Sequence, residues 1–280
     1  MVRFSSENVT DGIRRIWSMP AVCMYLVEGR EKAVLIDTGC GEKGLREYVE
    51  RLLQGKPYEV LLTHGHVDHA AGAGEFEQVW LHPADNALVQ RHCTVENRLA
   101  YWEHCKLILG GMQLPDRSDF VPMRTEPFLP LSDKQIFDLG GRTVQILHVP
   151  GHTRGMMVPF VPEEETAFLG DACGTGTLLV GEESTTVEEY YQSLLRLKKD
   201  APPFSRVLRQ HGSFVSEPSI LDENIEVCEK ILAGTDDAVP QKFMGQPCRK
   251  AIKVDPETRK RVDGKEGNIV YCTEKIRQKT

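Results

Sequence analysis

Thr63-His64-Gly65-His66-Val67-Asp68-His69 is the stretch of this 280-residue sequence that says most about its fold. It follows the short apolar run 59–62, which predicts a buried strand. Side chains two positions apart lie on the same side of an extended chain, so His64 and His66 can reach one ion. Imidazole and carboxylate groups are ligands for zinc, and also for iron or manganese. The heptapeptide therefore predicts a metal site directly after a strand.

Three further residues of ligand type stand where predicted strands end. They are His152, Asp171 and His211, each placed after a short apolar run. A single histidine in such a position is more often an ordinary surface residue. Loops at strand ends are, however, where a rigid sheet can aim several side chains at one point. The repetition of the arrangement therefore favours one shared site.

With these motifs in this order, the chain resembles the metallo-β-lactamase-fold superfamily over about residues 20–235. The resemblance rests on five features: Asp37-Thr38-Gly39, the His-x-His-x-Asp-His motif, Gly151-His152, Gly170-Asp171 and the late His211. It implies an α/β fold, a four-layer αββα sandwich of the metallo-β-lactamase type, with a pair of metal ions at the edges of the sheets.

The resemblance also implies a role for each residue. It assigns the ligands of both ions: His64, His66 and His152 for one, Asp68, His69 and His211 for the other, and Asp171 as the bridge. Asp37 would lie behind the ligands and orient them, as metal ligands usually require. Asp68 would in addition orient the nucleophile and so be catalytic. An aspartate at 171, where the best-known β-lactamases carry cysteine, resembles the glyoxalase II, lactonase, ribonuclease Z and flavodiiron branches.

Composition limits the other classes of function. Lys plus Arg total 34 against 41 Asp plus Glu, a formal net charge of −7, so we expect no general attraction to nucleic acid or to anionic membranes. No apolar run approaches the roughly 18 residues of a transmembrane helix, and the first residues lack the apolar region of a secretory signal. The eight cysteines are scattered without a CxxC pair. They predict buried, reduced thiols and a cytoplasmic location.

Hydrophobic periodicity predicts alternating strands and helices within a single domain over 1–280. Strands are expected at 21–27, 33–36, 59–62, 78–81, 135–139, 142–149, 156–161, 166–169, 206–209 and 268–272. Helices are expected at 42–54, 84–90, 186–199 and about 216–233. Residues 91–130 are interpreted as a helical and loop insertion near the site, and 241–280 as a polar C-terminal extension. Tyr101, Trp102, Met112 and Phe120 of the insertion fit either a substrate wall or the core of a small lid.

These observations predict a dinuclear metal-dependent hydrolase. A metal-bridging hydroxide would attack the carbonyl of a small thioester or ester, as in hydroxyacylglutathione hydrolases. Three alternatives stay open: a lactonase of the same fold, an iron-dependent redox enzyme of dioxygenase type on the same ligands, and a binding module without activity. Two divalent ions are expected, with zinc favoured over iron or manganese. The expected partner is a small-molecule substrate, and a homodimer is left open. The substrate-binding residues are not identified.

Overall fold

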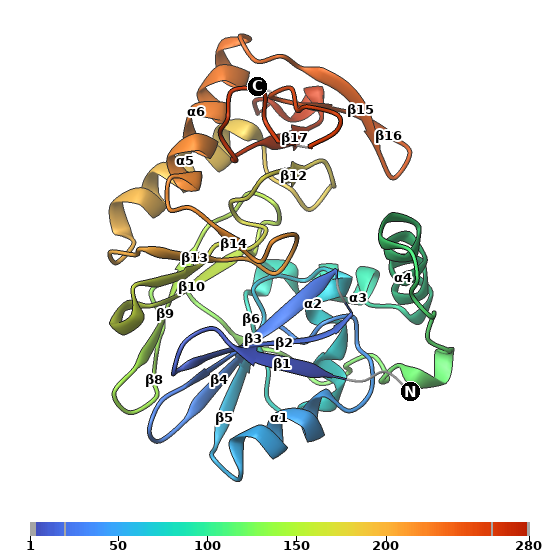
Figure 1. The fold of residues 1–280 in the computed structure, drawn as a ribbon, viewed down its shortest axis with the longest axis vertical. Helices are drawn as coiled ribbons and strands as arrows, with labels where there is room; N and C mark the ends of the chain where they lie inside the picture. Colours follow the sequence, from blue (N-terminus) through green and yellow to red (C-terminus); the bar gives the residue numbers. More distant parts are fainter. Residues whose placement is uncertain (1–3, 20, 259, 279–280) are drawn as a thin grey trace. The chain divides into compact units, whose positions relative to one another are not determined.

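The computed structural model describes residues 4–19, 21–258 and 260–278, and the chain divides into two compact units (Figure 1). Unit 1 consists of Met1–Ile146 together with Gln210–Gly212. Unit 2 consists of Leu147–Arg209 and Ser213–Thr280. That these units belong to a single domain stays a prediction.

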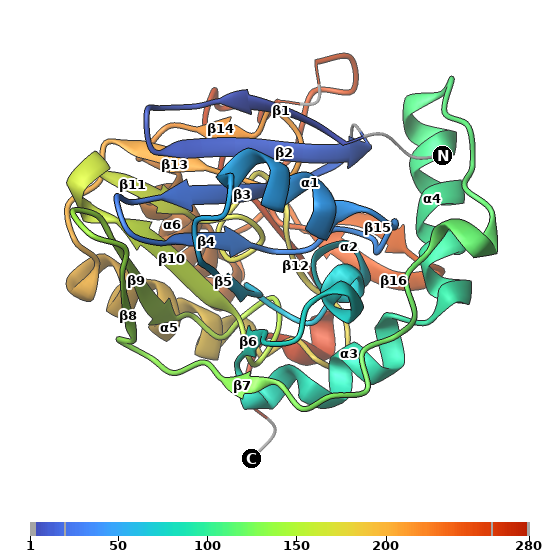
Figure 2. The ribbon, with the colours of Figure 1, turned by 90° about the horizontal axis from the view of Figure 1, so that it is seen from below.

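Unit 1 contains a seven-stranded sheet in which the strands are neighbours in sequence order (Figure 2). Their bounds are β1 Ser5–Asn8, β2 Ile13–Met19, β3 Val22–Glu28, β4 Ala33–Ile36, β5 Tyr58–Leu61, β6 Trp80–Leu81 and β7 Leu129–Pro130. Strands β1 to β4 pair antiparallel, whereas β4 to β7 pair parallel. Parallel strands end at the same edge of a sheet, so the loops after β4 and β5 start side by side.

Helices of unit 1 follow its parallel strands. Their bounds are α1 Leu45–Leu53, α2 Val67–Ala70, α3 Asn86–His92 and α4 Val95–Leu109, with 3₁₀ turns η1 Ala71–Glu75, η2 Pro83–Asp85 and η3 Arg117–Asp119. Residues 91–130 thus hold the end of α3, all of α4, and a loop that runs through η3 to β7. The unit also includes the short strand β8 Ile136–Asp138, which pairs antiparallel with the first residues of β9 Thr143–His148.

Unit 2 contains two groups of strands and two long helices. In the first group, β14 Val215–Ser216, β13 Arg206–Leu208, β11 Thr166–Phe168, β10 Met157–Val161 and β9 are neighbours in that order. In the second, the order is β12 Thr177–Leu179, β17 Ile269–Tyr271, β16 Gln246–Lys250 and β15 Val239–Phe243. The remaining elements are α5 Val187–Asp200, α6 Ile220–Ala233, η4 Pro162–Glu164 and η5 Thr273–Lys275.

Each unit has a hydrophobic core of its own. In unit 1, buried residues of β3, β4 and β5 pack against Leu45, Val49 and Leu53 of α1, which lie at helical spacing. In unit 2, α5 and α6 pack on the strands through residues such as Leu194 and Ile225. Burial of these side chains is the main favourable contribution to folding of each unit.

Many expected elements are present close to the expected bounds. Strand β4 has the expected residues, and a capping box of Thr186 and Glu189 begins α5, the helix expected at 186–199. Gly234 ends α6 in the left-handed conformation that glycine adopts easily. All eight cysteines are buried thiols, as expected. Among the described helices, none combines the length and the apolar character that crossing a bilayer requires.

Sequence reasoning missed several strands, and within 241–280, described as a polar extension, it expected only the strand at 268–272, which is present as β17. In the structure that segment provides β15, β16 and β17, and β17 pairs parallel with β12. Among its many polar residues, the segment contributes a few apolar side chains to the core of unit 2: Ala251, Ile252, Ile269 and Tyr271. The segment is therefore part of the folded unit despite its polar composition.

Candidate metal centre

The loop after β5 carries the histidine-rich motif, and its path is fixed by close packing. His66 has an extended backbone and caps α2. The backbone N–H of Gly65 donates to Asp85 Oδ2 at 2.9 Å. A Cβ on Gly65 would lie 3.0 Å from the carbonyl oxygen of Asp85. Glycine at this position therefore allows the loop to lie against η2 while His64 and His66 face the same way.

Asp37, on the loop after β4, receives four hydrogen bonds from other segments of unit 1. Its carboxylate accepts from the Thr63 backbone N–H at 2.7 Å and from the Thr63 hydroxyl at 2.9 Å. It also accepts from Nδ1 of His69 at 2.9 Å and from the Gln210 amide at 3.0 Å. Asp37 is fully buried and has a positive φ of 67°. This strained backbone is maintained by the hydrogen bonds that the carboxylate makes.

The partners of the imidazole Nδ1 atoms indicate which nitrogen can bind a metal. Nδ1 of His69 faces the Asp37 carboxylate, and Nδ1 of His211 lies 2.8 Å from the carbonyl oxygen of Ala21. Both partners are acceptors, so both Nδ1 atoms carry a proton and leave Nε2 for a metal. Nδ1 of His64 lies 3.1 Å from the Thr63 hydroxyl, which itself donates to Asp37. Asp37 thus orients His69 directly and His64 through Thr63.

Two groups of ligand atoms meet within unit 1. Nε2 of His64 lies 3.1 Å from Nδ1 of His66. Separately, Nε2 of His211 lies 3.1 Å from Nε2 of His69 and 3.2 Å from Oδ2 of Asp68. The second group, Asp68, His69 and His211, has the composition and spacing of a three-ligand metal site. Two ligands about 2.05 Å from a tetrahedral zinc ion lie about 3.3 Å apart, so these distances fit zinc.

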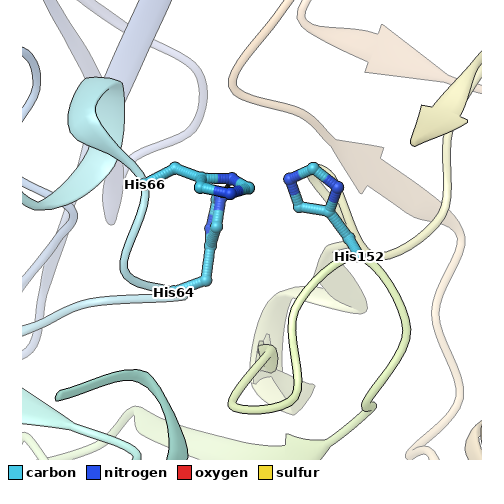
Figure 3. A group of neighbouring side chains, drawn as sticks. All are labelled: His64, His66 and His152. Carbon is cyan, nitrogen blue, oxygen red and sulfur yellow. Dashed lines mark hydrogen bonds between the residues drawn. The ribbon is translucent and has the colours of Figure 1, made fainter. Parts of the chain in front are cut away.

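Unit 2 holds the other two residues that the sequence singled out. His152 follows β9, and its Nδ1 lies 2.9 Å from the carbonyl oxygen of Leu178. This contact again leaves Nε2, which lies 3.7 Å from Oδ2 of Asp171. The hydroxyl of Ser184 donates to the His152 carbonyl at 2.8 Å. Figure 3 shows His64 and His66 on the loop that enters α2, and His152 on the loop after β9.

Three buried thiols of unit 1 are poor nucleophiles. Burial, reinforced by the Glu42 and Asp68 carboxylates, raises the pKa of Cys40 well above its usual value. Burial raises the pKa of Cys93 to about 12 and that of Cys105 to about 11. At neutral pH these side chains are protonated, and the thiolate is the nucleophilic form of cysteine.

Several contributors to the centre were not identified from the sequence. Thr63 and Gln210 were missed because a hydroxyl and an amide carry no signal until the fold brings them to Asp37. His92, at the end of α3, stacks on His66 with the ring centroids 5.1 Å apart. From the sequence alone, it stayed open whether His92 faces the site or the solvent. His82 caps η2 by accepting from the Ala84 backbone N–H.

Comparisons with known proteins show which family this sequence resembles. The sequence profile described as "Metallo-beta-lactamase superfamily" matches residues 21–204. The human protein "Acyl-coenzyme A thioesterase MBLAC2" is 28% identical over 185 residues, 62% of this chain and 66% of that protein. The "Probable polyketide biosynthesis zinc-dependent hydrolase BaeB" of Bacillus velezensis is 27% identical over 59% of this chain and 63% of its own length. The chain therefore matches slightly less than two thirds of each of these relatives.

A solved structure gives the same result for the fold. The metallo-β-lactamase from Pontibacter korlensis superposes with a TM-score of 0.58, over 81% of this chain and 99% of its own, at 16% identity. This similarity confirms the expected fold class, an α/β fold of the metallo-β-lactamase type. Since the family profile covers most of the chain, the protein belongs to the metallo-β-lactamase superfamily.

Proposed function

We propose that the chain is a metal-dependent hydrolase that cleaves small thioesters. The observation that carries this proposal is the common orientation of four imidazoles. His64, His69, His211 and His152 each place Nδ1 on a protein partner and leave Nε2 for a metal. Four histidines held in this way are typical of metal ligands.

The proposed centre holds two divalent ions, and zinc is the proposed metal. The ligands proposed for the first ion are His64, His66 and His152, those for the second are Asp68, His69 and His211, and Asp171 is the proposed bridge. This assignment follows the family pattern and is supported by the geometry of each unit. The presence of zinc in the name of the Bacillus relative supports the choice of metal.

When bound, the ions would supply an activated water and a Lewis acid for the carbonyl oxygen of the substrate. The protein's own residues prepare for this chemistry. Asp68 presents a carboxylate that can orient a water molecule and accept its proton. Asp37 keeps the ligands rigid, which lowers the reorganisation needed during the reaction. Burial raises the pKa of Cys40, Cys93 and Cys105, which disfavours a nucleophilic thiolate at these three positions.

The substrate class is proposed from the relatives. The human relative is named an acyl-coenzyme A thioesterase, and an Aspergillus relative, 28% identical over 58% of this chain, is named an atrochrysone carboxyl ACP thioesterase. A thioester is therefore favoured over an oxygen ester or a lactone. A cytoplasmic location and a homodimer stay predictions.

The test combines metal content with hydrolysis. We expect about two metal ions per chain by mass spectrometry, and release of a free thiol from acyl-CoA and acyl-glutathione substrates. His66→Ala and Asp68→Ala should each lower kcat/KM at least about 10³-fold and lower the metal content. His104→Ala, an exposed histidine on α4, is the matched control and should behave as the parent.

Three outcomes would contradict the proposal. Hydrolysis by His66→Ala at the parent rate would exclude the dinuclear assignment. One iron per chain with oxygen consumption would favour the dioxygenase alternative. Cleavage of lactones without cleavage of thioesters would favour the lactonase.

A further inference from the structure

Helix α3 packs directly on the loop that carries the histidine motif, beside α2 (Figure 2). A Cβ on Gly65 would lie 3.2 Å from Cβ of Leu88 and 3.2 Å from Cγ2 of Val89, and both of these side chains are buried. The thiol of Cys93, directly after α3, donates to the carbonyl oxygen of Gly65 with a distance of 4.0 Å from Sγ to the oxygen. The end of α3 is therefore fixed relative to the residues on both sides of Gly65.

His92 is the last residue of α3 and lies on the side of the helix that faces this loop. It follows Val89 by three residues, and side chains at this spacing share one face of a helix. The backbone next to His92 is also held, because the carbonyl oxygen of Cys93 accepts from the buried Arg98 guanidinium at 2.9 Å. The His92 ring stacks on His66, with 5.1 Å between the ring centroids and an angle of 20° between the ring planes.

The imidazole of His66 thus has a neighbouring ring on each of two sides. Its Nδ1 lies 3.1 Å from Nε2 of His64, and the rings of these two residues are nearly perpendicular, at 84°. The ring of His92 is instead nearly parallel to that of His66. If the His66 ring turned about its Cβ–Cγ bond, its edge would move into the face of His92. Aromatic rings in such a stacked arrangement also attract each other beyond the effect of burial.

We propose that His92 is a positioning residue, whose ring stacks on His66 and holds that imidazole in the orientation in which Nδ1 joins His64 as a metal ligand. This inference rests on the proposed function, because it takes His64 and His66 to be metal ligands. The property of His92 that matters is its flat ring, so another flat ring should replace it. The start of the 91–130 insertion thereby gains a role at the metal centre.

The test compares His92→Ala and His92→Phe with the parent in the full-length chain. Alanine removes the ring, whereas phenylalanine keeps a flat ring and removes the ring nitrogens. The first readout is zinc affinity, measured by competition with a chromophoric chelator. In His92→Ala we expect the affinity for one zinc ion to fall about 3- to 10-fold, as loss of a stacked pair predicts, and that for the other to change less than about twofold. His92→Phe should stay within about twofold of the parent for both ions.

The second readout is the visible absorption of the cobalt(II)-substituted protein, which depends on the arrangement of the ligands around the ion. The spectrum should change in His92→Ala and match that of the parent in His92→Phe. This measurement requires no substrate, so it is independent of which thioester the protein cleaves.

Three controls accompany these variants. His104→Ala, at an exposed position of α4 in the same unit, should leave both zinc affinities at the parent values. In a His66→Ala background, His92→Ala should cause no further loss of zinc affinity, because interacting residues give non-additive effects. Circular dichroism of the metal-free chains should show that each variant folds, and His92→Gln, which also lacks a ring, replaces His92→Ala if the alanine variant does not.

The outcomes separate this inference from the proposed function. A parent and a His92→Ala variant that bind two zinc ions equally tightly would overturn the role of His92 and leave the hydrolase proposal standing. Equal losses in His92→Ala and His92→Phe would overturn it as well, because the effect would then come from the ring nitrogens. A further loss in the His66→Ala background would also overturn it. A parent chain that binds no zinc would overturn both proposals.

Discussion

The two units hold their ligand-type residues in different ways. In unit 1, one buried carboxylate, Asp37, receives hydrogen bonds from Thr63, His69 and Gln210. In unit 2, His152 is held by separate contacts with Leu178 and Ser184. Loss of the shared acceptor Asp37 would disturb several segments of unit 1 together. Loss of one contact of His152 would disturb only one segment of unit 2. Unit 1 is therefore expected to be rigid and sensitive to single changes, and unit 2 more tolerant.

Asp37→Ala should have the largest effect. It leaves the buried donors on Thr63, His69 and Gln210 without their common acceptor, and the free energy of unfolding should fall by about 3–5 kcal/mol. Zinc affinity should fall as well, because His69 loses the partner that fixes its tautomer. Denaturation in urea measures the first effect and chelator competition the second. The control is Asp138→Ala, at the exposed last residue of β8 in unit 1. A similar loss of stability and of zinc affinity in both variants would contradict the special role of Asp37.

Two glycines, Gly72 after the His64–His69 motif in unit 1 and Gly151 before His152 in unit 2, provide a second comparison with smaller expected effects. A Cβ on Gly72 would lie 2.2 Å from the carbonyl oxygen of Thr38, and a Cβ on Gly151 would lie 2.2 Å from Cδ2 of Tyr190. Backbone moves less readily than a side chain, so Gly72→Ala should cost about 3 kcal/mol and Gly151→Ala about 1–2 kcal/mol. Gly176→Ala meets nothing within 4 Å and should change stability little. Thermal unfolding of the three variants measures the order of their stabilities. A larger loss in Gly151→Ala than in Gly72→Ala would contradict the expected difference between the units.

Ser184→Ala tests the separate contacts of unit 2. It removes the donor to the His152 carbonyl, which should lower the free energy of unfolding by about 1 kcal/mol. Metal content should stay at the parent value, since Nδ1 of His152 keeps its contact with Leu178. A loss of metal comparable to that in Asp37→Ala would show that unit 2 is no more tolerant than unit 1.

The smallest expected effect is the change in stability that ionisation of the buried thiols causes, which is negligible near neutral pH. Burial raises the pKa of Cys93 in unit 1 and of Cys173 in unit 2 to about 12. Unfolded thiols ionise at lower pH, so the stability that the neutral thiols provide is complete below about pH 8 and is lost as pH rises toward 12. Alkylation at pH 8, followed by mass spectrometry, should be slow at both positions in the folded chain and rapid in urea. Urea denaturation at pH 8 and pH 10 should show lower stability at pH 10.

The ligand motif of unit 1 could be predicted because its residues are adjacent in sequence, from His64 to His69. Asp37 and the residues of unit 2 needed the order of motifs in a known family. Thr63 and Gln210 could not be assigned, because each gains its role only through contact with a distant segment. The expected ligand roles stay predictions until metal binding is measured.

Local pattern also explains which strands were missed. Strand β2 contains Arg14 and Arg15, which make its sequence polar, yet Arg15 is buried and bonded to Glu7 and to the hydroxyl of Tyr25. Strand β12 has three residues and pairs with β17, which lies far along the chain. Pairing over such a separation leaves no periodicity within one window of sequence.

The inclusion of Gln210–Gly212 in unit 1 has a consequence for the order in which the chain folds during synthesis. The ribosome completes residues up to Ile146 first, and at that stage Asp37 lacks the Gln210 amide and His69 lacks His211. Roughly 65 further residues must be added, which takes about 3–13 s at the usual rate of translation. During this interval the nascent chain carries an incomplete set of the proposed ligands. Chaperones, and any metal ion captured early, would therefore encounter unit 1 before His211, the last of its proposed ligands, is present.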